Sequence, residues 1–139
     1  MDEMHAAEHD AREALDRAVE AGDVEGARDA IRAGVDLERR GAAGATALLT
    51  AAAKGDFAMV RALLSGGADV LAADDAGATA LHRAASIGRV DLVDELFGAG
   101  ARLEARDAAG RTALGAARAA GHAEAAALLI ERGADDEPA

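Results

Sequence analysis

The sequence predicts an all-α solenoid, in which short helix-turn-helix units stack along one axis. The phrase Thr-Ala-Leu occurs at residues 46–48, 79–81 and 112–114, so consecutive copies are 33 residues apart. A fixed period of this length is typical of repeat proteins whose units pack on their neighbours. Aromatic residues are only 1% of the 139 residues, and alanine supplies most of the apolar mass. This composition favours thin, closely packed helices over a thick globular core.

Three series of glycines follow the same period and divide the chain into four blocks. The blocks are residues 8–40, 41–73, 74–106 and 107–139, and we treat residues 1–139 as a single domain. The series are Gly22, Gly55, Gly88 and Gly121; Gly34, Gly67, Gly100 and Gly133; and Gly44, Gly77 and Gly110. Recurrent glycines predict positive φ angles. The first series should end one helix, and the second should follow the next helix at its C′ position.

The third block shows the elements that we expect in each unit. Residues 74–77, Asp-Asp-Ala-Gly, predict a β-turn finger in which Asp74 serves turn geometry. Thr79 should cap a short helix that ends near Ser86. A second helix should run from about Val90 to Phe97.

Apolar residues recur across the blocks and predict one continuous seam. The equivalent residues are Leu15, Leu48, Leu81 and Leu114, then Ala18, Ala51, Ala84 and Ala117, then Ile31, Leu64, Phe97 and Ile130. Two helices of about eight residues are marginally stable alone. Stability should therefore come mostly from the interfaces between neighbouring blocks.

The chain resembles the ankyrin-repeat proteins, which share this period and the phrase Thr-Pro-Leu-His-x-Ala. Here the phrase is complete except for proline in residues 79–84, Thr-Ala-Leu-His-Arg-Ala, and the histidine is kept only at His82. The resemblance implies an ankyrin-repeat solenoid with protruding β-turn fingers and a concave groove. It also implies that His82 is structural and hydrogen-bonds the turns that join blocks.

The first and last blocks are expected to act as caps. The first lacks the turn glycine and the threonine, and residues 10–13, Asp-Ala-Arg-Glu, predict a capping-box start for its helix. The last block has Ala123, Ala125 and Ala126 where inner blocks carry larger apolar residues.

Composition argues against several classes of function. The chain has no cysteine, so it has no disulfide or thiolate site, and its net charge of −11 argues against general affinity for nucleic acid. No apolar stretch is long enough to span a membrane, and the acidic start is unlike a secretory signal. We therefore expect a cytoplasmic monomer that needs no cofactor and no metal.

One motif suggests a zinc hydrolase, and we consider it a coincidence. Residues 5–9, His-Ala-Ala-Glu-His, match an inverted zinc-protease phrase, and on a helix His5 and His9 would share a face. A third ligand and a closed cleft are not visible in the sequence. Ser65 and Ser86 lie in no nucleophile elbow, so we predict no catalytic residue and no enzyme.

The sequence therefore predicts a non-catalytic module that binds a protein partner through its groove and fingers. The expected partner-binding residues are Arg40, Thr50, Lys54, Asp75, Ala78, Arg83, Ser86, Ile87, Arg106 and Arg111. They predict a mildly basic groove in an acidic protein. The alternative is a small acidic inhibitor or immunity-type protein that neutralises a basic enzyme. In that case the outer side of the second helices, with Asp91, Asp94 and Glu95, would make the contact.

Overall fold

The computed structural model describes residues 3–135, with side chains from residue 10 onward. That part of the chain is helical, with one isolated bridge between Ala73 and Thr79. The α-helices are α1 (Glu3–Ala21), α2 (Val24–Arg32), α3 (Ala47–Lys54), α4 (Phe57–Ser65), α5 (Ala80–Ser86), α6 (Val90–Gly98), α7 (Ala113–Ala119) and α8 (Ala123–Glu131). A short 3-10 turn, η1 (Ala42–Gly44), lies before α3. The predicted all-α class is confirmed.

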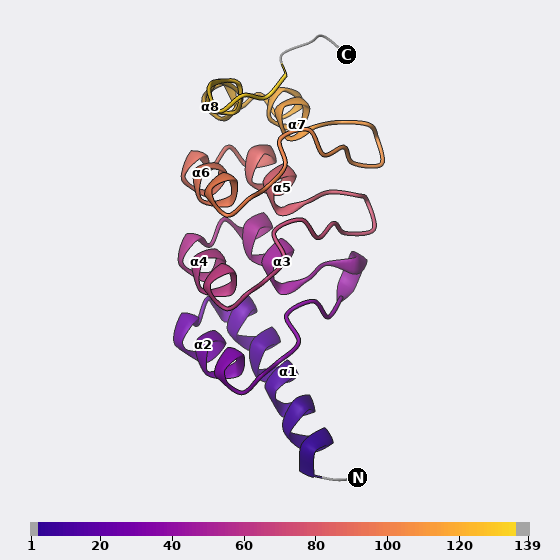
Figure 1. The fold of residues 1–139 in the computed structure, drawn as a ribbon, viewed down its shortest axis with the longest axis vertical. Coiled ribbons are helices and arrows are strands. Elements are labelled where there is room, and N and C mark those ends of the chain that lie inside the picture. The colour runs from indigo at the N-terminus through magenta and orange to yellow at the C-terminus, as the bar shows by residue number, and fades with distance from the viewer. Residues whose placement is uncertain (1–2, 136–139) are drawn as a thin grey trace.

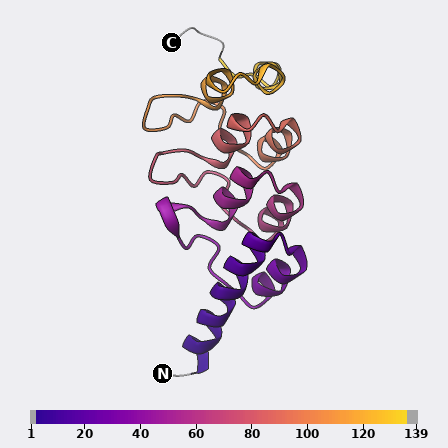
Figure 2. The same ribbon diagram turned by 180° about the vertical axis from the view of Figure 1, so that it is seen from behind.

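The helices form two parallel rows, as Figures 1 and 2 show. The first helices of the units, α1, α3, α5 and α7, make one row, and α2, α4, α6 and α8 make the other. The fingers before α3, α5 and α7 project from the side of the first row. Each unit packs on the next, and α1 extends beyond the stack at one end.

Threonine caps begin three of the first helices, as the repeated phrase predicts. The side chains of Thr46, Thr79 and Thr112 accept hydrogen bonds from backbone amides three residues later. Such caps satisfy amide groups that have no partner inside the helix. Asp23 and Asp56 cap α2 and α4 in the same way.

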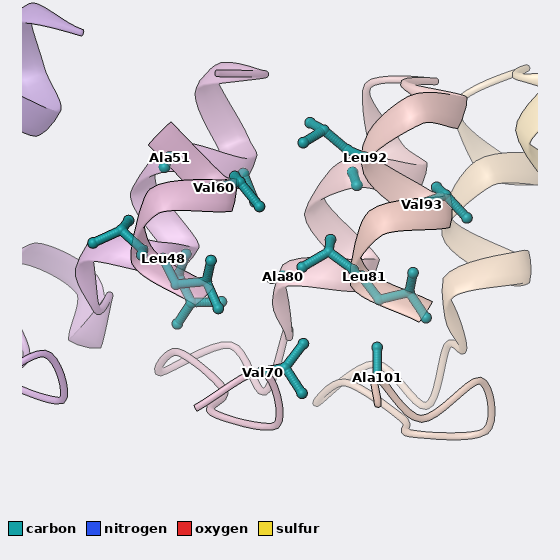
Figure 3. Packing of buried hydrophobic residues seen from close by; sticks show 14 of the residues in the cluster. Leu48, Ala51, Val60, Val70, Ala80, Leu81, Leu92, Val93 and Ala101 are labelled. Carbon is teal, nitrogen blue, oxygen red and sulfur yellow. The ribbon is translucent and has the colours of Figure 1, made fainter. Parts of the chain in front are cut away.

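The seam of buried side chains runs through all four units, and Figure 3 shows a part of it in the second and third units. Leu48, Leu81 and Leu114 are at most 3% exposed, so the leucine series of the first helices is confirmed. The expected series in the second helices lies at the edge of the seam: Ile31 and Leu64 are half-buried and pack against it, whereas Ile130 is 37% exposed. The fully buried residues there are Leu63, Leu96 and Leu129. They lie one residue earlier, on the side of the helix that faces the first row.

The glycines of all three series have positive φ angles, as predicted. Gly77 also lies where two fingers come close together. A Cβ atom on Gly77 would lie 2.9 Å from the amide nitrogen of Ala108, so a side chain there would force the fingers apart.

The first helix differs from the prediction. α1 begins at Glu3 and continues to Ala21, so Asp10 lies inside the helix and the predicted capping-box start at residues 10–13 is wrong. Residues 3–21 contain no glycine or proline, and they are rich in alanine, glutamate and arginine. These residues have high helix propensity, and nothing in this stretch ends the helix.

The last unit has a charged end. Ala78 and Ala85 are buried under the following unit, whereas the equivalent residues of the last unit are Arg111 and Arg118, both exposed. Terminal repeats need a polar outer face because no neighbour covers them. Arginines therefore stand at two seam positions where the third unit has buried alanines, and the role of the last block as a cap stays a prediction.

Candidate protein-binding groove

The exposed sides of α3, α5 and α7, together with the fingers, form what we call the groove face. Equivalent positions recur along it at the 33-residue period. Thr50 and Arg83 occupy one position, and Lys54 and Ile87 occupy another. All four are half-buried or exposed, while Leu48 and Leu81 on the other side of the same helices are buried. The repeat thus aligns these side chains on one surface.

Two of the fingers are built around an aspartate. The Asp74 carboxylate accepts hydrogen bonds from the amides of Ala76 (2.9 Å) and Ala78 (3.1 Å). Asp107 accepts in the same way from Ala109 (3.0 Å) and Arg111 (2.9 Å). The prediction that Asp74 serves turn geometry is confirmed, and Asp107 plays the same part in the next finger.

The environment of both aspartates favours the charged form. Burial opposes the charge on Asp74, but hydrogen bonds from the Arg83 guanidinium and from the Ala78 and Ala76 amides outweigh it and hold its pKa below the usual value. For Asp107, the Arg111 amide is the largest cause of a lowered pKa. Both fingers therefore carry a fixed negative charge at their base.

Adjacent fingers are joined through the backbone. The Asp75 amide donates to the Ala43 carbonyl at 3.0 Å, and the Ala108 amide donates to the Ala76 carbonyl at 2.9 Å. The exposed Asp75 side chain is therefore carried on a finger that its two neighbours hold in place.

The finger of the second unit is irregular because glycine replaces the aspartate. Gly41 stands where the next units have Asp74 and Asp107, so the Ala45 amide finds no carboxylate. That amide donates instead to the Ala42 carbonyl at 3.1 Å, which closes the 3-10 turn. The tighter turn places Ala43 at φ 56° and ψ 23°, a left-handed conformation that is unfavourable for a residue with a Cβ atom.

Two of the predicted groove arginines hold finger carbonyls. Arg40 donates to the carbonyls of Gly44 (2.7 Å) and Ala73, and Arg106 donates to the carbonyl of Gly110 (2.7 Å). Both side chains are exposed, but their guanidinium groups already have acceptors within the protein.

The remaining basic residues of the groove face also have partners. Arg83 forms an ion pair with Asp74, whose side chain is only 5% exposed. Arg111 lies 3.6 Å from the carboxylate of Asp107. Lys54 donates to the backbone carbonyl (2.9 Å) and the carboxylate (3.3 Å) of Glu20. Carboxylates therefore neutralise Lys54, Arg83 and Arg111, whereas the carbonyl partners of Arg40 and Arg106 are uncharged, so the face is less basic than the sequence suggests but keeps some positive charge.

The centre of the groove face is a shallow hollow of about 230 Å³ between α5 and α7. It is lined by Ala78, His82, Arg83, Ser86, Asp107, Arg111, Ala116, Ala119 and Ala120. Ala78 is 4% exposed, so it shapes the floor and offers almost no contact surface, contrary to its selection as a binding residue. Ser86 donates its hydroxyl to the His82 carbonyl at 2.8 Å. Ile87 is 39% exposed, and it adds a large aliphatic side chain to this face.

His82 joins two units, as the resemblance implies. Its Nδ1 accepts from the Thr79 amide at 3.2 Å, which places the ring proton on Nε2. Nε2 then donates to the Arg111 carbonyl at 2.8 Å. The ring is 2% exposed, so it is held between the units and is not presented to a partner.

The exposed sides of α2, α4, α6 and α8 form the outer face, and it is more balanced in charge than expected. Asp91, Asp94 and Glu95 are each paired with an arginine: Arg89 (2.7 Å), Arg132 (2.9 Å) and Arg61 (3.5 Å), respectively. A hollow of about 450 Å³ between α6 and α8 is lined by Val90, Asp91, Asp94, Glu124, Ala127, Leu128 and Glu131. Within the described residues, Glu124 and Glu131 have no ion-pair partner.

The sequence reasoning did not identify Arg89 as a link between units. It occupies the N-cap position where α2 and α4 have Asp23 and Asp56, and its side chain donates to the Gly55 carbonyl at 2.7 Å. The sequence signal was the arginine itself at a position where the earlier units have a capping aspartate. An arginine side chain cannot accept the hydrogen bond that the aspartate accepts from a backbone amide of the first turn.

The described residues hold no cluster of three or more His, Cys, Asp or Glu side chains that would bind a metal ion. The side chains of His5 and His9, on which the zinc interpretation depends, lie outside the described part of the structure. No described helix combines the length and the hydropathy that crossing a membrane requires.

Comparison with known proteins agrees with the geometry. A family model described as ankyrin repeats (3 copies) matches residues 4–107 and again residues 74–138. A search of curated protein sequences returned no match. Together the two matched ranges cover nearly the whole stack, including the helix pairs and the fingers that join them. The chain belongs to the ankyrin-repeat family.

Proposed function

We propose that this protein is a non-catalytic module that holds a protein partner against its groove face. Ankyrin repeats are generally protein–protein interaction modules. The observation that carries the proposal is the alignment of Thr50 with Arg83 and of Lys54 with Ile87 on exposed sides of successive helices. A surface of this kind suits an extended or helical segment that crosses several units.

Hydrogen bonds within the protein hold the fingers of the groove face in place. Asp74 and Asp107 fix two fingers internally, and backbone hydrogen bonds join the fingers to each other. Such preorganisation reduces the entropy lost on association. The chain has no tryptophan or tyrosine, which are residue types enriched at binding hot spots. We therefore expect the partner to supply the large anchoring side chains.

A pair of matched substitutions tests which face binds. Ile87 on the groove face and Val90 on the outer face are both β-branched and similarly exposed, at 39% and 36%. Ile87→Arg and Val90→Arg place the same bulk and charge on opposite sides of the third unit. Each variant is immobilised and used to capture partners from a lysate of the natural source. The bound proteins are quantified by mass spectrometry against the wild-type chain.

We expect Ile87→Arg to abolish capture and Val90→Arg to leave it unchanged, with similar thermal unfolding for both. The opposite result would favour the alternative, an acidic inhibitor that binds a basic enzyme through the outer face. The unpaired Glu124 and Glu131 beside the outer hollow are the feature that keeps this alternative open. Capture that survives both substitutions would contradict the groove proposal.

A further inference from the structure

Loops that follow the second helices are linked by carboxylates. The Asp69 amide in one loop donates to Glu38 Oε2 in the preceding loop at 3.0 Å. The Asp135 amide donates to Glu104 Oε1 at 2.9 Å. The same contact thus occurs at two places in the stack. A glutamate at this position of one unit is held at the right distance to accept an amide of the next unit.

The equivalent contact in the middle of the stack is missing. There the glutamate is replaced by Leu71, and the amide belongs to Arg102. Within the described residues, the Arg102 amide has no acceptor and its guanidinium has no carboxylate partner. Leu71 is 42% exposed, the highest value among the large hydrophobic side chains of the described part. An amide donor, a cation and an aliphatic surface therefore lie together without partners.

These groups surround a hollow of about 240 Å³, lined by Val70, Leu71, Thr79, Arg102 and Ala105. Figure 3 shows Val70 on its loop, beside the helices of the second and third units. The hollow shares no residue with the groove hollow between α5 and α7. It is also separate from the outer hollow between α6 and α8.

We propose that this hollow, which we call the loop-edge site, binds an acidic segment of a protein partner. A carboxylate of that segment takes the place of the missing glutamate and accepts a hydrogen bond from the Arg102 amide. Glu38 and Glu104 accept the equivalent hydrogen bonds from Asp69 and Asp135. The Arg102 guanidinium adds a charge-assisted contact. An aliphatic side chain of the same segment packs on Leu71 and Val70. This inference goes beyond the groove proposal, because it assigns a second contact surface.

The two intact contacts argue for a carboxylate as the occupant. Glu38 and Glu104 show that the backbone amide at this position donates to a carboxylate where the chain supplies one. A nucleic-acid phosphate would also suit Arg102, but a chain with a net charge of −11 repels a polyanion. The exposed leucine adds an apolar requirement that a phosphate backbone does not meet.

The test is an NMR titration of the full ¹⁵N-labelled chain with a capped peptide, Ser-Glu-Ser-Leu-Ser. Residues two apart in an extended segment lie on the same face, so the peptide presents the carboxylate beside the leucine. We expect saturable shifts of the Arg102 and Leu71 amides. Peptides with Gln for Glu or Ala for Leu should shift them much less. A thymidine oligonucleotide is a further arm, and larger shifts with it than with the peptide would overturn the proposal.

Variants of the chain make the assignment specific. Leu71→Glu restores the missing carboxylate within the protein and should abolish the peptide-induced shifts. Arg102→Gln should weaken the apparent affinity about two- to fivefold, the range for one exposed ion pair. Ala58→Ser, on the exposed side of α4, should change nothing. Each ¹⁵N spectrum also reports whether the variant is folded.

The proposal fails if the Arg102 amide does not move, or if Leu71→Glu binds the peptide as the wild-type chain does. Equal shifts from the Glu and Gln peptides would also contradict it. These outcomes are independent of the groove proposal, because none of the residues substituted or monitored in the peptide titration belongs to the groove face.

Discussion

His82 Nε2 donates to the carbonyl of Arg111, 29 residues later in the sequence, at 2.8 Å, so one imidazole joins two consecutive units. The equivalent residue in the second unit is Leu49, which is equally buried. This position therefore accepts either a polar link or an apolar side chain. Within residues 10–135, the interface between the third and fourth units is the one that has this histidine link.

Replacing this histidine should weaken one interface. His82→Leu keeps the volume but leaves the Thr79 amide without its acceptor, and a buried unpaired donor costs about 1–2 kcal/mol. We expect the free energy of unfolding, measured in urea, to fall by this amount. Hydrogen exchange should accelerate in α7 and α8 more than in α2 and α4. His122→Leu is the control, because that side chain caps no amide. Equal acceleration in all helices would contradict a local link.

The ion pair between Asp74 and Arg83, at the base of the finger of the third unit, should make the stability of the protein depend on pH. The pKa of Asp74 is lowered in the folded protein from an ordinary value of 3.8. Its charge therefore stabilises the fold above about pH 4. That contribution is lost as the pH falls through the lowered folded pKa. Asp74→Asn keeps an acceptor for the finger amides but removes the charge, so its melting temperature should fall less on acidification.

The measurement is calorimetric melting of the wild-type chain and Asp74→Asn between pH 2.5 and 6. The difference between them should be largest at the upper end and should shrink below pH 3.8. Arg83→Met removes the cation that pairs with Asp74 and should shrink the same difference at pH 6. A constant difference across the range would show that the charge of Asp74 does not contribute.

The period predicted the helices because caps and breakers act locally. Thr79 begins α5 through an amide three residues away, and glycines end the helices wherever φ must be positive. Side-chain partners were harder to predict. Arg83 reaches Asp74, nine residues earlier, and no periodic pattern states which way an exposed arginine points. The groove was therefore predicted as more basic than it is, because the sequence does not show that Lys54, Arg83 and Arg111 are paired with carboxylates.

Departures from the repeat carried more information than the sequence reasoning took from them. Gly41, Leu71 and Arg102 each break a series, and each break has a structural consequence: an irregular turn or an unpartnered amide. The helical start at Glu3 was missed for the opposite reason. The repeat pattern predicts a break near Asp10, whereas local helix propensity continues through it.

The irregular finger of the second unit provides a test in which two equivalent substitutions should change the free energy of unfolding in opposite directions. Ala43 has a left-handed backbone, whereas the equivalent Ala76 does not. Ala43→Gly should stabilise the protein by about 1 kcal/mol, because glycine adopts this conformation without strain. Ala76→Gly should destabilise it by about 0.4–1 kcal/mol, because there glycine only adds freedom to the unfolded chain. Chemical denaturation measures both, and equal signs would contradict the assigned strain.

Leu81 tests whether the stack is cooperative across its centre. The side chain is fully buried between the second and fourth units, so Leu81→Ala should cost about 2–5 kcal/mol through loss of contacts and formation of a cavity. Stability in a repeat protein comes largely from nearest-neighbour interfaces. We therefore expect two separated transitions on heating, whereas Leu114→Ala, in the last unit, should only loosen that end. Calorimetry measures the transitions. A single sharp transition in Leu81→Ala would contradict this prediction, because it would show that the interfaces on either side of the residue still couple the two halves of the stack.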